Sequence, residues 1–289
     1  MITLENEHLR VSIRTKGAEL TSIYNKLTQM EHLWQADPVI WEWYAPNLFP
    51  VVGECLDNKI LVNNASYTLN RHGFARTSEF NVLKNTDKHA EFSLGYNEST
   101  LEVYPFQFQF QILYHLSDNQ LKITYKVINA DDKSIYFSVG GHPAFNVPFS
   151  PSDSFEDYYV EFEHQERLQT HLLTEGGLFT GETETLELSD GKLMLTKELF
   201  KKGALVFKDL SSKKVRLKSK NRSEFLEVNY PHFPYIALWT KDDAPFICIE
   251  PWVGCADTAG RPNDISKKEG IRKLEKGHVF EADYTISIG

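Results

Sequence analysis

Apolar and polar residues alternate along two neighbouring stretches, residues 106–114 and 121–127, with one interruption at Leu113. Successive side chains point to opposite faces of a β-strand, so the alternation predicts two strands, each with one buried and one solvated face. The polar residues 117–120 between them predict a turn and therefore an antiparallel hairpin. Alternation also predicts hairpins of 79–83 with 90–94 and of 206–210 with 215–217, and strands at 225–230 and 279–288.

Helical periodicity is scarce, and no predicted strand alternates with a helical stretch of about 10–15 residues. This excludes the βαβ units of a parallel sheet. Many short strands along 289 residues are typical of an all-β protein. The sequence shows neither a linker nor a repeat of fixed period. We therefore predict a single domain, residues 1–289, folded as a large antiparallel β-sandwich.

The charge balance excludes one class of partner. The chain has 31 Lys and Arg residues against 40 Asp and Glu residues, a formal net charge of −9. Nucleic-acid-binding proteins neutralise phosphates with a basic surface, so we expect no nucleic-acid partner. No stretch approaches the roughly 18 apolar residues of a transmembrane helix, and the N-terminus is charged throughout. We therefore expect neither a membrane segment nor a signal peptide.

Three cysteines, Cys55, Cys248 and Cys255, form no Cys-x-x-Cys pair. This odd number disfavours both a disulfide framework and a structural zinc site, and it indicates reduced thiols in the cytoplasm. The ten histidines show no spacing typical of metal ligands, and no glycine-rich phosphate loop occurs. We therefore predict neither a metal nor a cofactor.

His142 is the first candidate for chemistry, because two glycines precede it and a proline follows it. These neighbours allow an unusual backbone path that presents the imidazole to a cavity. An imidazole exchanges protons near neutral pH, as acid–base catalysis requires. The alternative is a buried histidine whose nitrogens are satisfied by a loop carbonyl.

Glu250 is the second candidate, since it ends the apolar stretch 246–249 and precedes Pro251. A carboxylate at the end of a core strand is either desolvated and paired or able to act as a base. The alternative is a glutamate at a strand end that is turned towards water.

His72 and Arg76 are candidate ligand contacts, four residues apart in a segment that breaks the strand pattern. Together they can donate hydrogen bonds to hydroxyl or phosphate oxygens. The alternative is a surface loop held by ion pairs. Tryptophans can stack on the apolar face of a sugar, although most are expected in the core. They are Trp34, Trp41, Trp43, Trp239 and Trp252.

Five segments follow one another in a distinctive order: PNLFPVVG at 46–53, RHGFAR at 71–76, GGHPAFNVP at 140–148, YIALWT at 235–240 and ICIEPW at 247–252. Together they resemble the aldose 1-epimerase, or galactose mutarotase-like, family. The resemblance covers essentially the whole chain and is strongest to the branch that includes LacX-like proteins and hexose-6-phosphate mutarotases. It implies the large, mostly antiparallel β-sandwich called the supersandwich, with a small aldose as partner.

The resemblance also implies positions for the site. His142 and Glu250 fall on the histidine and glutamate of the family's motifs, where they are the predicted catalytic residues. The substrate-contacting segment of the family falls on His72 and Arg76. Further predicted substrate contacts, in the first and fourth segments, are Asn47 and Trp239.

Two positions depart from the family pattern. Glu54 stands where relatives commonly have an arginine, directly after the glycine of the first segment. Lys202 and Gly203 stand where many relatives have an acidic residue. A contact to a sugar hydroxyl or a phosphate is therefore expected to be missing, which affects the identity of the substrate more than the reaction.

The implied activity is interconversion of the α and β anomers of an aldose by ring opening and reclosure, with Glu250 as base and His142 as acid. One alternative is a non-catalytic carbohydrate-binding protein. Another is a glycoside hydrolase, which needs two carboxylates about 5–10 Å apart, with Asp257 or Glu54 as partner of Glu250. The sequence does not distinguish free from phosphorylated aldoses, or a monomer from a homodimer.

Overall fold

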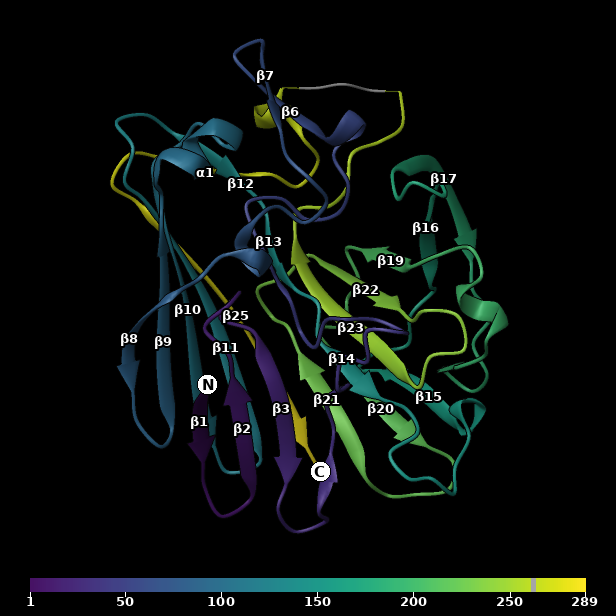
Figure 1. Ribbon diagram of the computed structural model, residues 1–289. Coiled ribbons are helices and arrows are strands. Elements are labelled where there is room, and N and C mark those ends of the chain that lie inside the picture. The colour runs from purple at the N-terminus through teal and green to yellow at the C-terminus, as the bar shows by residue number, and fades with distance from the viewer. Residues whose placement is uncertain (261–263) are drawn as a thin grey trace.

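The chain folds into antiparallel β-sheets stacked in layers (Figure 1), over the residues that the computed structural model describes, 1–260 and 264–289. This confirms the predicted all-β fold class. The large sheet has the strand order β18-β15-β20-β21-β25-β11-β10-β9-β8. In chain order, its strands are β8 (Asn81–Asn85), β9 (His89–Gly95), β10 (Phe108–Ser117), β11 (Gln120–Asn129), β15 (Tyr158–Phe162), β18 (Lys192–Met194), β20 (Lys214–Ser219), β21 (Phe225–Asn229) and β25 (Val279–Ile288).

A second sheet has the order β19-β22-β23-β13-β5, and β14 also pairs with β23. Its strands are β5 (Asn47–Leu48), β13 (Val139–Gly141), β14 (Ala144–Asn146), β19 (Leu205–Lys208), β22 (Tyr235–Trp239) and β23 (Phe246–Val253). The N-terminal sheet consists of β1 (Ile2–Glu5), β2 (Leu9–Ile13), β3 (Leu20–Asn25) and β4 (Met30–Glu31). Short strands pair as β6 (Lys59–Val62) with β7 (Ala65–Thr68), β12 (Ile135–Phe137) with β24 (Arg272–Leu274), and β16 (Gln169–Leu173) with β17 (Phe179–Thr185).

Helical structure is limited in the described residues. The α-helix is α1 (Glu98–Val103), and the 3₁₀ turns are η1 (Leu56–Asn58), η2 (Ala75–Thr77), η3 (Phe155–Asp157), η4 (Glu198–Phe200) and η5 (Ile265–Lys267). None of these helices is both long and apolar enough to cross a membrane.

The alternation in the sequence corresponds to the two faces of the large sheet. In β10, buried residues such as Phe108 and Phe110 alternate with partly exposed ones. The N-terminal sheet and the β22–β23 sheet lie in front of the large sheet in Figure 1, and they add Val11 and Ile249 to the same apolar cluster. A continuous cluster that includes both ends of the chain is what one core requires, so a single domain over residues 1–289 stays our prediction.

Two of the three predicted hairpins are present. β10 pairs with β11, and β8 pairs with β9. The first turn is shorter than predicted, because Ser117 already pairs with Gln120. The predicted hairpin of 206–210 with 215–217 is wrong: β19 pairs with β22, whereas β20 pairs with β15 and β21 in the large sheet. The polar residues between β19 and β20 connect two sheets, and alternation cannot reveal this because it shows which residues share a face but not which strand is the neighbour.

The β22–β23 sheet presents its two faces to different surroundings. Ile236, Leu238 and Ile249 belong to the main core. Trp239 and Glu250 point to the other face, as the two-residue period of a strand requires. This outer face is where polar side chains gather.

Candidate active site

A cavity of about 310 Å³ lies on the outer face of the β22–β23 sheet. The segment after β13, the segment around η2 and the β16–β17 hairpin also contribute to its lining. Five of the six predicted site residues line this cavity, and they are His72, Arg76, His142, Trp239 and Glu250. Segments that are far apart in the sequence therefore meet at one place.

Strand register brings His142 to Glu250. β13 and β14 both pair with β23, on either side of His142: Gly140 lies opposite Trp252, and Ala144 lies opposite Cys248. The same register, continued through the interruption between the two strands, sets His142 opposite Glu250. Residues directly opposite each other in an antiparallel pair have side chains on the same face, so both reach the cavity.

Gly140 and Gly141 serve close packing, whereas the sequence suggested an unusual backbone path. A Cβ atom on Gly140 would lie 2.7 Å from Trp252 Cδ1, and one on Gly141 would lie 2.6 Å from the hydroxyl oxygen of Tyr284. The backbone of both glycines is outside the left-handed region. Glycine is required here because β13 passes very close to side chains of β23 and β25.

The two catalytic candidates, His142 and Glu250, are close together and buried, and they have few other hydrogen-bond partners. His142 Nε2 lies 3.3 Å from Glu250 Oε2, and their side chains are 11% and 1% exposed. Among the described residues, His142 Nδ1, Glu250 Oε2 and Trp252 Nε1 have no hydrogen-bond partner of good geometry. Buried polar atoms are normally satisfied, so these atoms mark a place where a polar ligand can supply the missing bonds.

Burial shifts both pKa values towards the uncharged forms. It raises the pKa of Glu250 well above its ordinary value, and the nearby Trp252 indole opposes this only in part. It also lowers the pKa of His142 to about 3, and the charge of Arg76 adds to the effect. Burial therefore favours a state of the pair in which Glu250 carries a proton and the imidazole of His142 is neutral.

His72 supplies a fixed hydrogen-bond donor beside His142. Its Nδ1 accepts a hydrogen bond of 3.1 Å from the backbone N–H of Gly53, so in the neutral ring the proton is on Nε2. Burial, with the charges of His142 and Arg76, holds the pKa of His72 well below its ordinary value. The rings of His72 and His142 meet edge to face with centroids 5.6 Å apart. His72 can therefore donate one N–H while it stays uncharged.

Two arginines lie at the edge of the cavity. Arg76 donates from Nη2 to the carbonyl oxygen of Arg71 at 3.0 Å, and its guanidinium lies 5.2 Å from the centroid of the Trp43 ring. Arg71 donates from Nε to Glu54 Oε2 at 2.7 Å. A guanidinium is therefore present beside position 54, although residue 54 itself is acidic. Sequence reasoning missed this pair, because residues 17 positions apart carry no local signal of contact.

At Lys202 and Gly203, the second place where the sequence departs from the family pattern, the cavity wall has open space. Gly203 lines the cavity, and a Cβ atom there would have no neighbour within 4 Å among the described residues. Lys202 donates from Nζ to Glu184 Oε2 at 2.7 Å. Neither residue replaces the acidic side chain that many relatives have at this place.

Some of the tryptophans line the cavity, whereas others lie around it. The ring of Trp239 lines the cavity and meets that of His142 edge to face, with ring centroids 5.7 Å apart. Trp41 lies 5.1 Å from His142 between ring centroids and also lines the cavity, as does Trp252. Trp41 was named only among tryptophans in general, because its loop carries no motif.

Asn47 does not line the cavity, in contrast to the prediction. Its Nδ2 donates to the carbonyl oxygens of Gly17 and Ala18, at 2.9 and 3.0 Å. Its Oδ1 accepts a hydrogen bond of 2.7 Å from the hydroxyl of Tyr125. The amide is fully used inside the protein, so we assign Asn47 to the support of the core and not to substrate contact.

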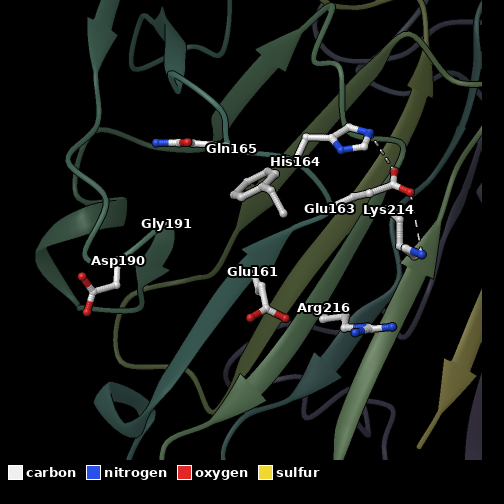
Figure 2. A pocket seen from close by; sticks show the side chains of 9 residues that line it. Glu161, Glu163, His164, Gln165, Asp190, Gly191, Lys214 and Arg216 are labelled. Atoms are coloured by element: carbon white, nitrogen blue, oxygen red, sulfur yellow. Dashed lines mark ion pairs between the residues drawn. The ribbon is translucent and has the colours of Figure 1, made fainter.

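A second hollow, of about 610 Å³, lies on the β15–β20 part of the large sheet (Figure 2). Its charged side chains, such as Glu161, Glu163 and Lys214, are exposed or partly exposed. Glu163 pairs with His164 at 3.9 Å and with Lys214 at 3.7 Å, as the dashed lines in Figure 2 mark. Glu161 and Glu163 are each 32% exposed, so water reaches the carboxylates of this hollow and they are not desolvated as Glu250 is.

Known proteins resemble this chain over its whole length. A sequence profile described as aldose 1-epimerase matches residues 1–287. The chromosomal LacX protein of Lactococcus lactis subsp. lactis is 32% identical over 296 aligned residues, which cover 99% of each chain.

Two crystal structures are similar in both sequence and fold. A galactose mutarotase-like protein from Lactobacillus casei ATCC 334 is 32% identical, with a TM-score of 0.95 and complete coverage of both chains. A galactose mutarotase related enzyme from Lactobacillus acidophilus is also 32% identical, with a TM-score of 0.94 over 99% of this chain and 96% of that one. The chain belongs to the aldose 1-epimerase family, as its five sequence segments predicted.

Proposed function

We propose that this protein interconverts the α and β anomers of an aldose, with Glu250 and His142 as the proton-transfer groups. The observation that carries the proposal is the buried pair itself, 3.3 Å apart in a cavity and with polar atoms that lack partners among the described residues. Mutarotation needs one proton removed from the C1 hydroxyl and one delivered to the ring oxygen. Two titratable groups side by side match this requirement.

The proposed step conserves protons. Glu250, as a carboxylate, takes the proton from the C1 hydroxyl. The bond between C1 and the ring oxygen breaks, its electron pair goes to the ring oxygen, and His142, as an imidazolium, gives that oxygen its proton. The product is the open-chain aldehyde, which rotates about the C1–C2 bond and recloses by the reverse transfers to give the other anomer.

Burial acts differently on the two ends of this step: it disfavours the carboxylate and imidazolium with which the step begins and favours the neutral groups with which it ends. At the open-chain stage Glu250 is a neutral acid and His142 a neutral imidazole, and burial favours the uncharged form of each group. The cavity thus lowers the free energy of the intermediate. The hydroxyl groups of a bound sugar can donate hydrogen bonds to Glu250, which favours the carboxylate needed at the start.

The remaining cavity residues suit a sugar. His72 offers one neutral N–H donor, and Arg71 and Arg76 offer further donors for hydroxyl oxygens. Trp41 and Trp239 present aromatic surface next to His142, on which an apolar sugar face can stack. We expect these groups to orient the aldose for the proton transfers.

A glycoside hydrolase would need a second carboxylate beside Glu250, and both candidates for it are bound to other groups. Asp257 accepts hydrogen bonds from the backbone N–H of Leu56 at 2.9 Å and from Lys268 Nζ at 2.5 Å. Glu54 is held by Arg71 at 2.7 Å. A general acid must be free to protonate a leaving group, and these two carboxylates are already engaged.

Polarimetry on freshly dissolved aldoses tests the proposal. The protein is expected to accelerate the approach to anomeric equilibrium of at least one member of a panel of free and 6-phosphorylated α-hexoses. Saturable sugar binding without acceleration would identify a binding protein instead. Release of reducing sugar from a chromogenic glycoside would identify a hydrolase.

A further inference from the structure

Cys248 lies beside the proton-transfer pair, yet mutarotation makes no use of it. The imidazole of His142, the thiol of Cys248 and the carboxylate of Glu250 each offer a ligand atom, and these atoms all lie within 4.8 Å of one another. We propose that these three residues bind one Zn²⁺ ion, and that the bound ion blocks the cavity to the aldose. The binding stands on geometry alone, whereas the inhibition rests on the proposed function.

The strand register explains why the three side chains converge. Cys248 and Glu250 are two residues apart in β23 and therefore point to the same face. His142 lies opposite Glu250 in the register of β13 and β14, while Ala144 pairs with Cys248 itself. All three side chains are buried, so the ligand set is held by the sheet and not by a loose loop.

The spacing fits zinc. Zn–N and Zn–O bonds of about 2.0–2.1 Å in a tetrahedron set neighbouring ligand atoms about 3.3 Å apart. The distance between His142 Nε2 and Glu250 Oε2 is 3.3 Å. A Zn–S bond of about 2.3 Å sets the sulfur about 3.5 Å from the other two ligand atoms, and the sulfur already lies within 4.8 Å of both.

The chemistry of the donors selects the class of metal. A thiolate, an imidazole and a carboxylate suit zinc and related borderline ions, whereas Mg²⁺ and Ca²⁺ prefer oxygen ligands alone. On binding, the S–H bond of Cys248 and the O–H bond of the Glu250 carboxyl group break, sulfur and oxygen bond to zinc, and both protons leave to solvent. Three protein ligands leave a fourth position for water, on the side of the cavity.

The surroundings indicate an inhibitory ion and not a resident cofactor. Histidine ligands of resident metals normally hold their second nitrogen in a hydrogen bond. His142 Nδ1 has no such partner among the residues that the structure describes. We therefore expect reversible binding, in which zinc occupies the atoms of Glu250 and His142 that exchange protons with the aldose and so competes with it.

Cobalt titration of the metal-free protein tests the binding without any sugar. One equivalent of Co²⁺ is expected to produce the near-ultraviolet absorption of a thiolate–Co²⁺ bond, and Zn²⁺ should abolish it by displacement. Cys248→Ala should lose this absorption. Cys255→Ala is the matched control, because Cys255 is equally buried but does not belong to the cluster, and it should keep the absorption.

Inhibition of mutarotation by zinc tests the second part of the proposal, that the bound ion blocks the cavity to the aldose. Zn²⁺, but not Mg²⁺, is expected to raise the apparent KM for the aldose, and Cys248→Ala should require at least about tenfold more Zn²⁺ for the same effect. If Cys248→Ala does not fold, Cys248→Ser replaces it, since serine keeps the size and removes the sulfur. Absence of the thiolate absorption in the wild-type protein, or its survival in the Cys248 variant, overturns the proposal even if the protein proves to have no mutarotase activity. Equal zinc inhibition of the wild type and the Cys248 variant overturns it as well.

Discussion

The protein brings a glutamate and a histidine together in two hollows, and the surroundings of the two pairs differ. Glu250 and His142 lie 3.3 Å apart with side chains 1% and 11% exposed. Glu163 and His164 lie 3.9 Å apart with side chains 32% and 57% exposed (Figure 2). Water reaches both side chains of the second pair and screens the interaction between them. The comparison teaches that residue types alone do not make a reactive pair, because desolvation decides what the pair can do.

The two pairs also arise in different ways. Glu163 and His164 are neighbours in the chain, so their proximity needs no tertiary structure. Glu250 and His142 meet only because β13 and β14 both pair with β23. A pair assembled by strand register can be enclosed by the sheets that assemble it, whereas a local pair at a strand end stays at the surface.

Removal of the buried pair has the largest expected effect. Glu250→Gln and His142→Asn should each lower kcat for mutarotation by about 10²–10⁴-fold, since each removes one proton-transfer group and keeps a similar shape. Polarimetry measures the rate, and circular dichroism checks the fold. The matched surface variants, Glu163→Gln and His164→Asn, should leave kcat unchanged. Similar losses in both sets would contradict the distinction between the pairs.

The buried histidine should also make stability depend on pH. The pKa of His142 is lowered from 6.5 to about 3 by burial. Between these pH values His142 binds one proton more in the unfolded chain than in the folded chain, so this residue by itself lowers the free energy of unfolding by about 1.4 kcal/mol for each pH unit of acidification. Urea unfolding at pH values from about 6.5 down to about 4 measures this slope. His142→Asn should make the slope shallower, while an equal change in His164→Asn would count against the comparison.

Packing beneath the buried pair predicts a smaller effect on stability. Gly140→Ala should lower the free energy of unfolding by about 1–3 kcal/mol, because the new methyl group overlaps Trp252. Gly95→Ala is the control, since a Cβ atom there meets nothing within 4 Å among the described residues, and it should change stability by less than about 0.5 kcal/mol. Thermal unfolding of both variants checks the difference. If Gly140→Ala proved as stable as the control, close packing would not be the reason for that glycine.

The surface pair predicts the smallest effect. Lys214→Ala removes the second partner of Glu163, at 3.7 Å, from an exposed site. Exposed ion pairs contribute about 0–1 kcal/mol, so the free energy of unfolding should change by no more than that, and by less at high salt. Urea unfolding at low and high salt measures the change. A loss above about 2 kcal/mol would show that this hollow is more than a solvated surface.

Much of the fold could be predicted from the sequence because strand patterns are local. Alternation identified β10, β11 and β25, whose buried and exposed residues follow the two-residue period. It failed where pairing is not local, since β19 and β20 join different sheets. It also missed α1, whose signal is the capping pair of Asn97 and Thr100 rather than a hydrophobic stripe.

The site was predicted only in part. Motifs identified five residues that line the cavity. A motif does not show where a side chain points, however. Asn47 belongs to the same segment as Gly53, which lines the cavity, but the Asn47 amide forms its hydrogen bonds in the core. Arg71 was not assigned, because its partner Glu54 became visible only in the folded chain. Trp41 lies in a loop that no pattern describes.

The sequence by itself determined which residues of each strand share a face, because side-chain direction alternates with every residue and needs no partner. It thereby put Cys248 and Glu250 on one side of β23. Only the tertiary structure decided that His142 lies opposite Glu250, and that both side chains are almost fully buried. Proximity and desolvation arise when segments more than a hundred residues apart pack together, and no local pattern of residues contains that information.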